Sequence, residues 1–206
     1  MICYFSLEFF ILSSFISNFI NKAKNLKKTL EEYKKIISYC KEIFYKKNYD
    51  YGNSWKILRL VSFNDQIIIK IKRIRYIQEK EKNKIVIIND LYSDFIGIIN
   101  YSIFAIISLD FEYNSFFKSN INLNIFYDNV IFDSLDLLEI KNKNYQDYWI
   151  NMDLKSILDI ILMRLLRIKK IKYNNEITLV SDGIRSNYQD IINYSILSLI
   201  KVGFCK

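Results

Sequence analysis

The six residues IINYSI occur twice in this chain, at Ile98–Ile103 and at Ile191–Ile196, 93 positions apart (191 − 98). Each copy lies in a longer and mainly apolar run, which is too long for an ordinary strand and shorter than the roughly 20 residues that span a bilayer. The asparagine of each copy, Asn100 or Asn193, would be costly to bury without a hydrogen-bond partner. The same polar residue in the same apolar setting twice indicates a duplicated structural unit.

The rest of the chain repeats the same order of residues at an offset of 94, which falls to 93 before the last apolar run. Chance is a poor explanation, because the matches are collinear along most of the sequence. The matching pairs are Tyr33 with Tyr127, Ile36 with Val130, Lys47 with Lys141, Tyr51 with Tyr145, Trp55 with Trp149, Asp65 with Asp159, Lys70 with Arg164, and Arg73 with Arg167.

Apolar residues at three- and four-residue spacing predict the helices of each repeat. In the first repeat we expect a helix over 25–47 with Thr29 as a capping residue, and a second over 63–78 capped by Ser62. A charged loop over 79–91 should then lead into the helix that carries IINYSI. The predicted fold class is all-α: a tandem duplication of a three-helix unit, packed as a pseudo-two-fold helical bundle.

The absence of Pro and the scarcity of Gly fit helices joined by short polar loops. We expect both repeats to share one globular domain. The predicted boundaries are 1–24 for an apolar N-terminal extension, 25–110 for the first repeat, 111–122 for a linker and 123–206 for the second repeat.

Residues 1–20 are strongly apolar and aromatic. They could form a membrane anchor or a signal peptide, or translation could begin further along the chain. No basic segment precedes the apolar part, which argues against a signal peptide. Glu8 would cost on the order of 3 kcal/mol at the centre of a bilayer, which argues against a span. The sequence leaves these alternatives open, and we expect a membrane contact only through residues 1–20, if at all.

The net charge of +8 is compatible with binding to nucleic acid, but the lysines are scattered rather than gathered in a basic patch. Nucleic acid is therefore a disfavoured partner. Cys3, Cys40 and Cys205 lack metal-site spacing, and the chain has no histidine, so a zinc site and a disulfide framework are both disfavoured. This cysteine usage fits the reducing cytoplasm, which is the predicted location.

The combined order of motifs resembles the nucleotide modification associated domain 1 family over about residue 25 to the C-terminus. The matching pattern is DYG-x-x-W, S-x-x-D-x-x-x-x-K-x-x-R-I, an acidic loop, and D-F-x-x-I-I-N-Y-S. The residues that carry it are Asp50, Tyr51, Gly52, Trp55, Ser62, Asp65, Lys70, Arg73, Ile74, Asp94, Phe95, Asn100 and Tyr101.

The resemblance implies an all-α fold distantly similar to MazG-type NTP pyrophosphatases, which hold Mg²⁺ with acidic residues on packed helices. Those enzymes carry an E-x-x-D pair, but here the first repeat has Asp94 followed by Gly97, and the second has Asn187 followed by Asp190. Each repeat thus keeps half of the pair. On one interpretation the halves combine into a single Mg²⁺ site with phosphate-binding cations beside it. The metal candidates are Asp94, Asp190, Asp65 and Asp159, and the phosphate-binding candidates are Lys70, Arg73, Arg164 and Arg167.

A second interpretation makes the same residues structural. Asp65 and Asp159 would stabilise helix N-termini, and Asn100 and Asn193 would bond each other across packed helices. The aromatic residues Tyr51, Trp55, Tyr145 and Trp149 could stack on a base or anchor the core.

Two functions therefore remain open. The first is a nucleotide-binding protein of MazG-like type that could act as a Mg²⁺-dependent pyrophosphohydrolase on a nucleotide or modified nucleotide. The second is a non-catalytic helical scaffold. A homodimer is compatible with either function, and the catalytic residues are not identified.

Overall fold

A computed structural model describes residues 2–52, 54–79, 84–113, 122–145, 148–174 and 182–205. Side chains are described within 27–52, 54–79, 88–110, 122–142, 149–174 and 182–205.

Each repeat consists of a first helix, a short 3₁₀ turn and two further helices. The first repeat contains α1 (Ile2–Tyr51), η1 (Ser54–Ile57), α2 (Leu60–Glu79) and α3 (Lys84–Tyr113). The second contains α4 (Leu123–Tyr145), η3 (Tyr148–Asn151), α5 (Leu154–Tyr173) and α6 (Ile184–Lys201). No strand occurs among the described residues. The all-α class and the duplication of a three-helix unit are confirmed.

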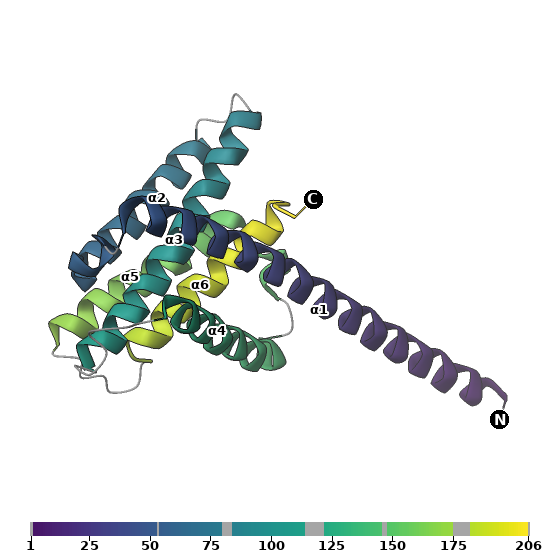
Figure 1. Cartoon of the computed structure of the whole chain (residues 1–206). Helices are drawn as coiled ribbons and strands as arrows, with labels where there is room; N and C mark the ends of the chain where they lie inside the picture. The colour runs from purple at the N-terminus through teal and green to yellow at the C-terminus, as the bar shows by residue number, and fades with distance from the viewer. Residues whose placement is uncertain are drawn as a thin grey trace.

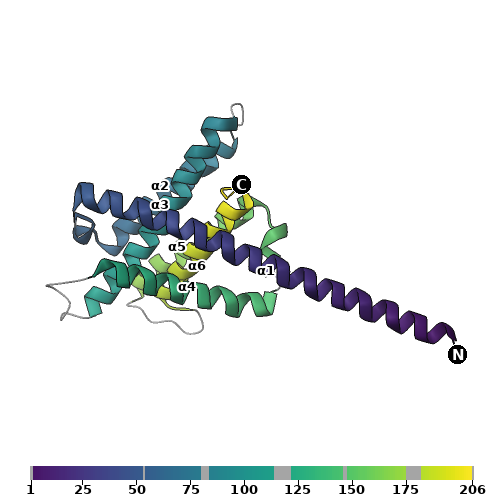
Figure 2. The same cartoon turned by 45° about the vertical axis from the view of Figure 1, so that its right-hand side comes forward.

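The third helices of the two repeats, α3 and α6, pack against each other in the middle of the molecule. Each also packs against the second helix of its own repeat, α2 or α5, and against both first helices. The N-terminal part of α1 extends well beyond the bundle in both views (Figures 1 and 2). The apolar extension is therefore continuous with a helix of the core.

The second helix of each repeat buries one apolar face. In α2 the buried positions Phe63, Ile67, Ile71 and Ile74 recur at three- and four-residue spacing, so they share one face of the helix. The equivalent residues of α5 are buried as well: Ile157, Ile161, Leu165 and Ile168. The same sequence pattern thus directs both helices onto the central α3–α6 pair.

The two repeats are joined by a reciprocal pair of buried hydrogen bonds. The hydroxyl of Tyr33 in α1 donates to Asn193 Oδ1 in α6 at 2.9 Å. The hydroxyl of Tyr127 in α4 donates to Asn100 Oδ1 in α3, also at 2.9 Å. Because Tyr127 is the equivalent of Tyr33 and Asn193 that of Asn100, exchanging the repeats reproduces the contact. This is the pairing that an approximate two-fold axis between the repeats would give.

Each asparagine also ties its helix to the first helix of its own repeat. Asn100 Nδ2 donates to the carbonyl of Cys40 at 3.1 Å, and Asn193 Nδ2 donates to the carbonyl of Ser134 at 2.7 Å. Cys40 and Ser134 are themselves equivalent at the offset of 94. The expectation that the two asparagines bond each other was therefore wrong, because each amide is already satisfied by a tyrosine of the other repeat and a backbone carbonyl of its own.

Several predicted boundaries were also wrong. Thr29 and Ser62 lie inside α1 and α2 rather than at their starts, because both helices begin earlier than the capping residues suggested. The loop predicted over 79–91 is shorter, since α3 already begins at Lys84. Most of the predicted linker, 111–122, lies outside the described residues.

Within the described part of the chain, one stretch is long and apolar enough to cross a membrane, Ile88–Asp110. Of its most apolar window, 72% is buried inside the bundle. This stretch is therefore part of the core helix α3.

We predict that Tyr33→Phe and Tyr127→Phe each lower the free energy of unfolding by about 1–3 kcal/mol, since each leaves a buried asparagine oxygen without a donor. Urea unfolding followed by circular dichroism measures the loss. Tyr173→Phe is the control, because that side chain is 81% exposed. Unchanged stability in both buried variants would contradict the structural role of these hydrogen bonds.

We also predict that the protein loses stability at alkaline pH. Burial raises the pKa of Tyr33 and of Tyr127 above the ordinary value of 10. Below pH 10 both hydroxyls are protonated in the folded and the unfolded chain, so stability is complete. As the pH rises above 10, the unfolded chain releases these protons first, and the free energy of unfolding falls. Melting temperatures between pH 9 and 11 should fall less steeply in the doubly substituted Phe variant.

Candidate functional site

Two carboxylates are buried in the central helices, and they are the two halves of the acidic pair noted in the sequence. Asp94 of α3 is 1% exposed, and Asp190 of α6 is 2% exposed. A buried carboxylate is costly unless it is paired with a cation. In each repeat, basic side chains reach inward from neighbouring helices to provide that pairing.

The first-repeat cluster consists of Asp94, Lys70, Arg73 and Asp90. Lys70 Nζ lies 3.5 Å from Asp94 Oδ1, and Arg73 Nε lies 3.4 Å from Asp94 Oδ2. The Arg73 guanidinium also contacts Asp90, with 2.8 Å between Nη2 and Oδ1. Burial raises the pKa of Asp94, and the charges of Lys70 and Arg73 oppose that shift. The cluster contains two cations and two carboxylates, so its charges balance.

The Lys70 side chain occupies the place where the first repeat lacks its second acid. A Cβ added to Gly97 would lie 2.3 Å from Lys70 Cε and 2.8 Å from Lys70 Nζ. The glycine therefore lets the lysine cross the surface of α3 and reach Asp94, one turn earlier in the helix.

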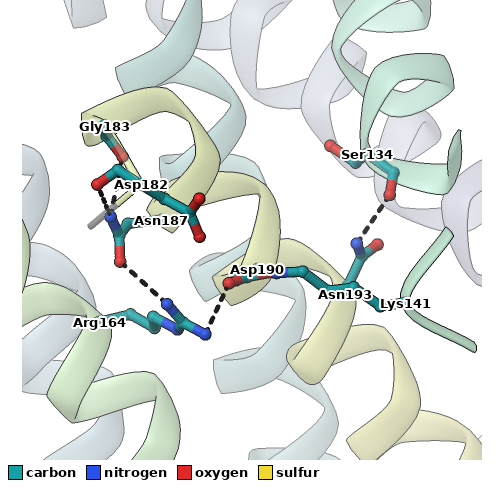
Figure 3. A network of polar contacts seen from close by, with 8 residues as sticks. All are labelled: Ser134, Lys141, Arg164, Asp182, Gly183, Asn187, Asp190 and Asn193. Carbon is teal, nitrogen blue, oxygen red and sulfur yellow. Dashed lines mark hydrogen bonds and ion pairs between the residues drawn. The ribbon is translucent and has the colours of Figure 1, made fainter. Parts of the chain in front are cut away.

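The second-repeat cluster consists of Asp190, Lys141, Arg164 and Asn187 (Figure 3). Lys141 Nζ lies 2.5 Å from Asp190 Oδ1, and Arg164 Nη2 lies 2.9 Å from Asp190 Oδ2. Arg164 Nη1 donates to Asn187 Oδ1 at 3.4 Å. Nε of the same arginine is buried and has no hydrogen-bond partner. Here two cations face a single carboxylate.

Both acidic partners of Arg73 are missing from the second repeat. Asp94 is replaced by Asn187, and Asp90 by Gly183. Arg167, the equivalent of Arg73, is exposed and makes no ion pair within the described part of the chain. The second repeat has kept the cations and lost two of the anions that would neutralise them.

The structure separates the remaining predicted metal ligands from these clusters. Asp65 and Asp159 are exposed and form reciprocal ion pairs between α2 and α5: Lys169 Nζ lies 3.3 Å from Asp65 Oδ1, and Arg75 contacts Asp159. Among the described residues, no group of three or more Asp, Glu, Cys or His side chains could hold a metal ion. The composite site expected from Asp94, Asp190, Asp65 and Asp159 is not formed.

The aromatic candidates divide between core and surface. Trp55 and Trp149 are each 8% exposed, and Trp55 stacks on Phe104 with ring centroids 4.7 Å apart. This placement fits core anchors rather than base-stacking platforms. Tyr51 is 69% exposed at the end of α1, and the side chain of Tyr145 lies outside the described residues.

Two members of the clusters were not singled out from the sequence. The sequence identifies Lys141 only as the equivalent of Lys47, and the loop predicted over 79–91 includes Asp90. The signal for Asp90 was its position four residues before Asp94, which places two carboxylates on one helical face. Lys141 joins its cluster only because α4, the first helix of the second repeat, packs against α6, and the sequence does not indicate this contact.

This arrangement suits an anion better than a cation. Each buried aspartate orients basic groups whose side chains remain partly exposed, from 14% for Arg164 to 50% for Arg73. Arginine and lysine held in this way are donors for phosphate oxygens. Mg²⁺ needs several oxygen ligands in octahedral geometry, whereas Asp94 and Asp190 are far too few and already face cations. The donor set does not fit the expected magnesium ion.

Comparison with known proteins gives one family match. The family model for nucleotide modification associated domain 1 matches residues 47–109 and 141–202, one segment in each repeat. No curated protein and no solved structure gives a significant match. The two matched segments contain both clusters and together cover more than half of the chain.

We predict that Asp190→Asn lowers the free energy of unfolding by about 1–3 kcal/mol, because it leaves Lys141 and Arg164 without their anion in a partly buried setting. The matched control is Asp159→Asn, whose carboxylate is 68% exposed and should matter by less than about 1 kcal/mol. Urea unfolding compares the two variants. Equal losses would show that burial does not govern the strength of these ion pairs.

Proposed function

Because the chain belongs to the nucleotide modification associated domain 1 family, we propose that it is a nucleotide-binding protein of MazG-like all-α type. Its ligand is a nucleotide or a modified nucleotide, bound through its phosphate groups in the cytoplasm. The observation that carries the proposal is the pairing of the partly exposed Lys141 and Arg164 side chains with the buried Asp190 in the second repeat.

The role of the buried aspartate is to position the cations. A long basic side chain loses conformational freedom when it is fixed on a ligand. Arg164 is already held by Asp190 and Asn187, so part of that cost is met before any ligand arrives. The remaining N–H groups of the guanidinium can then donate to phosphate oxygens.

The proposal is for binding without metal-dependent hydrolysis at these clusters. Cleavage between the α and β phosphates by a MazG-type mechanism requires carboxylates that gather around Mg²⁺. Asp94 and Asp190 instead direct their oxygens at lysine and arginine. If the protein were a pyrophosphohydrolase, its metal ligands would have to come from elsewhere in the chain.

We predict that nucleoside triphosphates raise the melting temperature of the purified protein in buffer with EDTA, as expected for a ligand that binds only the folded chain. Nucleosides without phosphate should have no effect. Thermal shift over a panel of NTPs and dNTPs measures binding, and release of pyrophosphate with added Mg²⁺ measures turnover.

Three outcomes separate the alternatives. A shift in EDTA without turnover supports the proposal. Turnover with Mg²⁺ would make the protein a pyrophosphohydrolase and overturn the metal-free part. No shift with any nucleotide, with or without Mg²⁺, would favour the helical scaffold.

A further inference from the structure

We propose that only the second repeat forms a working phosphate site, composed of Lys141, Arg164 and Arg167, and that the equivalent cluster in the first repeat is neutralised by its own acids. The inference rests on the proposed function and locates the ligand within it. It predicts one bound phosphate chain for each protein chain, although the fold contains two copies of the unit.

The balance of charge separates the two clusters. In the first, Lys70 and Arg73 face Asp90 and Asp94, so two cations meet two carboxylates. In the second, Lys141 and Arg164 face only Asp190, and no described acid pairs with Arg167. Three cations against one ion-paired carboxylate leave an excess of two positive charges, and the nearby Asp182, which contacts Asn187 through its backbone carbonyl, forms no ion pair with these cations among the described residues. That excess positive charge matches a doubly charged phosphate group. The first cluster has no excess positive charge.

The excess arises from identifiable substitutions. Arg73 is held between Asp90 and Asp94 of α3, but the equivalent positions beside Arg167 are Gly183 and Asn187. Arg164 and Arg167 are three residues apart on α5, so they occupy neighbouring positions on one side of the helix. The change from acid to glycine and amide therefore leaves two adjacent arginines without a full set of counterions.

A shift of the carboxylate along the helix adds the third cation. Asp190 lies one turn later in α6 than Asp94 does in α3, at the position equivalent to Gly97. There it meets Lys141 from the end of α4. Lys47, the equivalent lysine of the first repeat, is exposed and pairs with neither Asp90 nor Asp94. The second cluster thus draws its cations from two helices on either side of α6.

Gly183 provides a test that adds a charge without disturbing the core. A Cβ at this position would meet no atom within 4 Å, and its φ of −68° suits any residue. The residue is the N-cap of α6 and makes no side-chain cap hydrogen bond, so an aspartate there should favour the helix. Gly183→Asp reproduces the residue type of Asp90 and should neutralise Arg167 as Asp90 neutralises Arg73.

The experiment is calorimetric titration of the full chain with ATP and, as a base-free probe, with inorganic tripolyphosphate, both in EDTA. We expect one ligand per chain. Arg167→Gln and Gly183→Asp should each weaken binding roughly 10-fold, the loss of about one charged hydrogen bond. Arg73→Gln, the same change in the first repeat, should leave affinity unchanged. Lys169→Gln on α5 controls for the loss of one positive charge outside the cluster.

The outcomes distinguish this inference from the proposed function. Two ligands per chain, or equal weakening by Arg73→Gln and Arg167→Gln, would overturn the placement while leaving nucleotide binding intact. If Lys169→Gln weakened binding as much as Arg167→Gln, the loss of affinity would reflect only the lower net charge of the protein. That result would also overturn the placement of the site. If neither probe binds the unsubstituted protein, the proposed function fails and this site fails with it. Thermal melting of each variant confirms that it is folded.

Discussion

The exchange of hydrogen bonds between tyrosine and asparagine is the constraint on which the arrangement of the two repeats depends. The interface between the repeats is mainly apolar, but it buries the hydroxyls of Tyr33 and Tyr127. It also buries the amides of Asn100 and Asn193, and all four groups need hydrogen-bond partners there. Apolar packing alone tolerates sliding of one helix on another. The four polar groups can form their hydrogen bonds in only one register. Sliding is therefore unfavourable, because it would leave these groups buried and unpaired. The reciprocal bonds therefore fix how the first helix of each repeat meets the third helix of the other repeat, α1 on α6 and α4 on α3.

Once that interface is fixed, other positions can diverge as long as their partners change with them. Tyr188 in α6 donates to Asn64 Oδ1 in α2 at 2.7 Å, deep in the core. The equivalent positions carry Phe95 and Leu158, both fully buried and both apolar. The first combination of positions therefore holds a tyrosine and an asparagine. The equivalent combination holds a phenylalanine and a leucine. Each combination avoids an unsatisfied buried group, so the repeats differ in chemistry while sharing a backbone plan.

The fold class could be predicted from the sequence, because the helical periodicity and the internal repeat are both visible in the order of the residues. The helix predicted over 63–78 is observed as α2, but its predicted capping residue, Ser62, lies inside the observed element. Capping patterns such as the one at Thr29 recur inside helices, where tertiary packing overrides them. The clusters were recovered only in part, because the partner of Asp190 comes from α4 and is set by packing rather than by spacing. The expected resemblance to metal-binding enzymes predicts a cluster of acids, whereas basic side chains gather around each buried aspartate.

The position of a single carboxylate explains why two similar sequences produce different clusters. On α3 the acid stands at Asp94, and Gly97 makes room for Lys70 to lie across the helix. On α6 the acid stands at Asp190, the position equivalent to Gly97, and there it pairs with Arg164 of α5 and Lys141 of α4. One turn of helix therefore decides which basic side chains the buried carboxylate pairs with: Lys70 and Arg73 in the first repeat, Lys141 and Arg164 in the second. None of the cluster side chains takes part in the tyrosine–asparagine hydrogen bonds that join the repeats, so the two clusters can differ while those bonds stay the same.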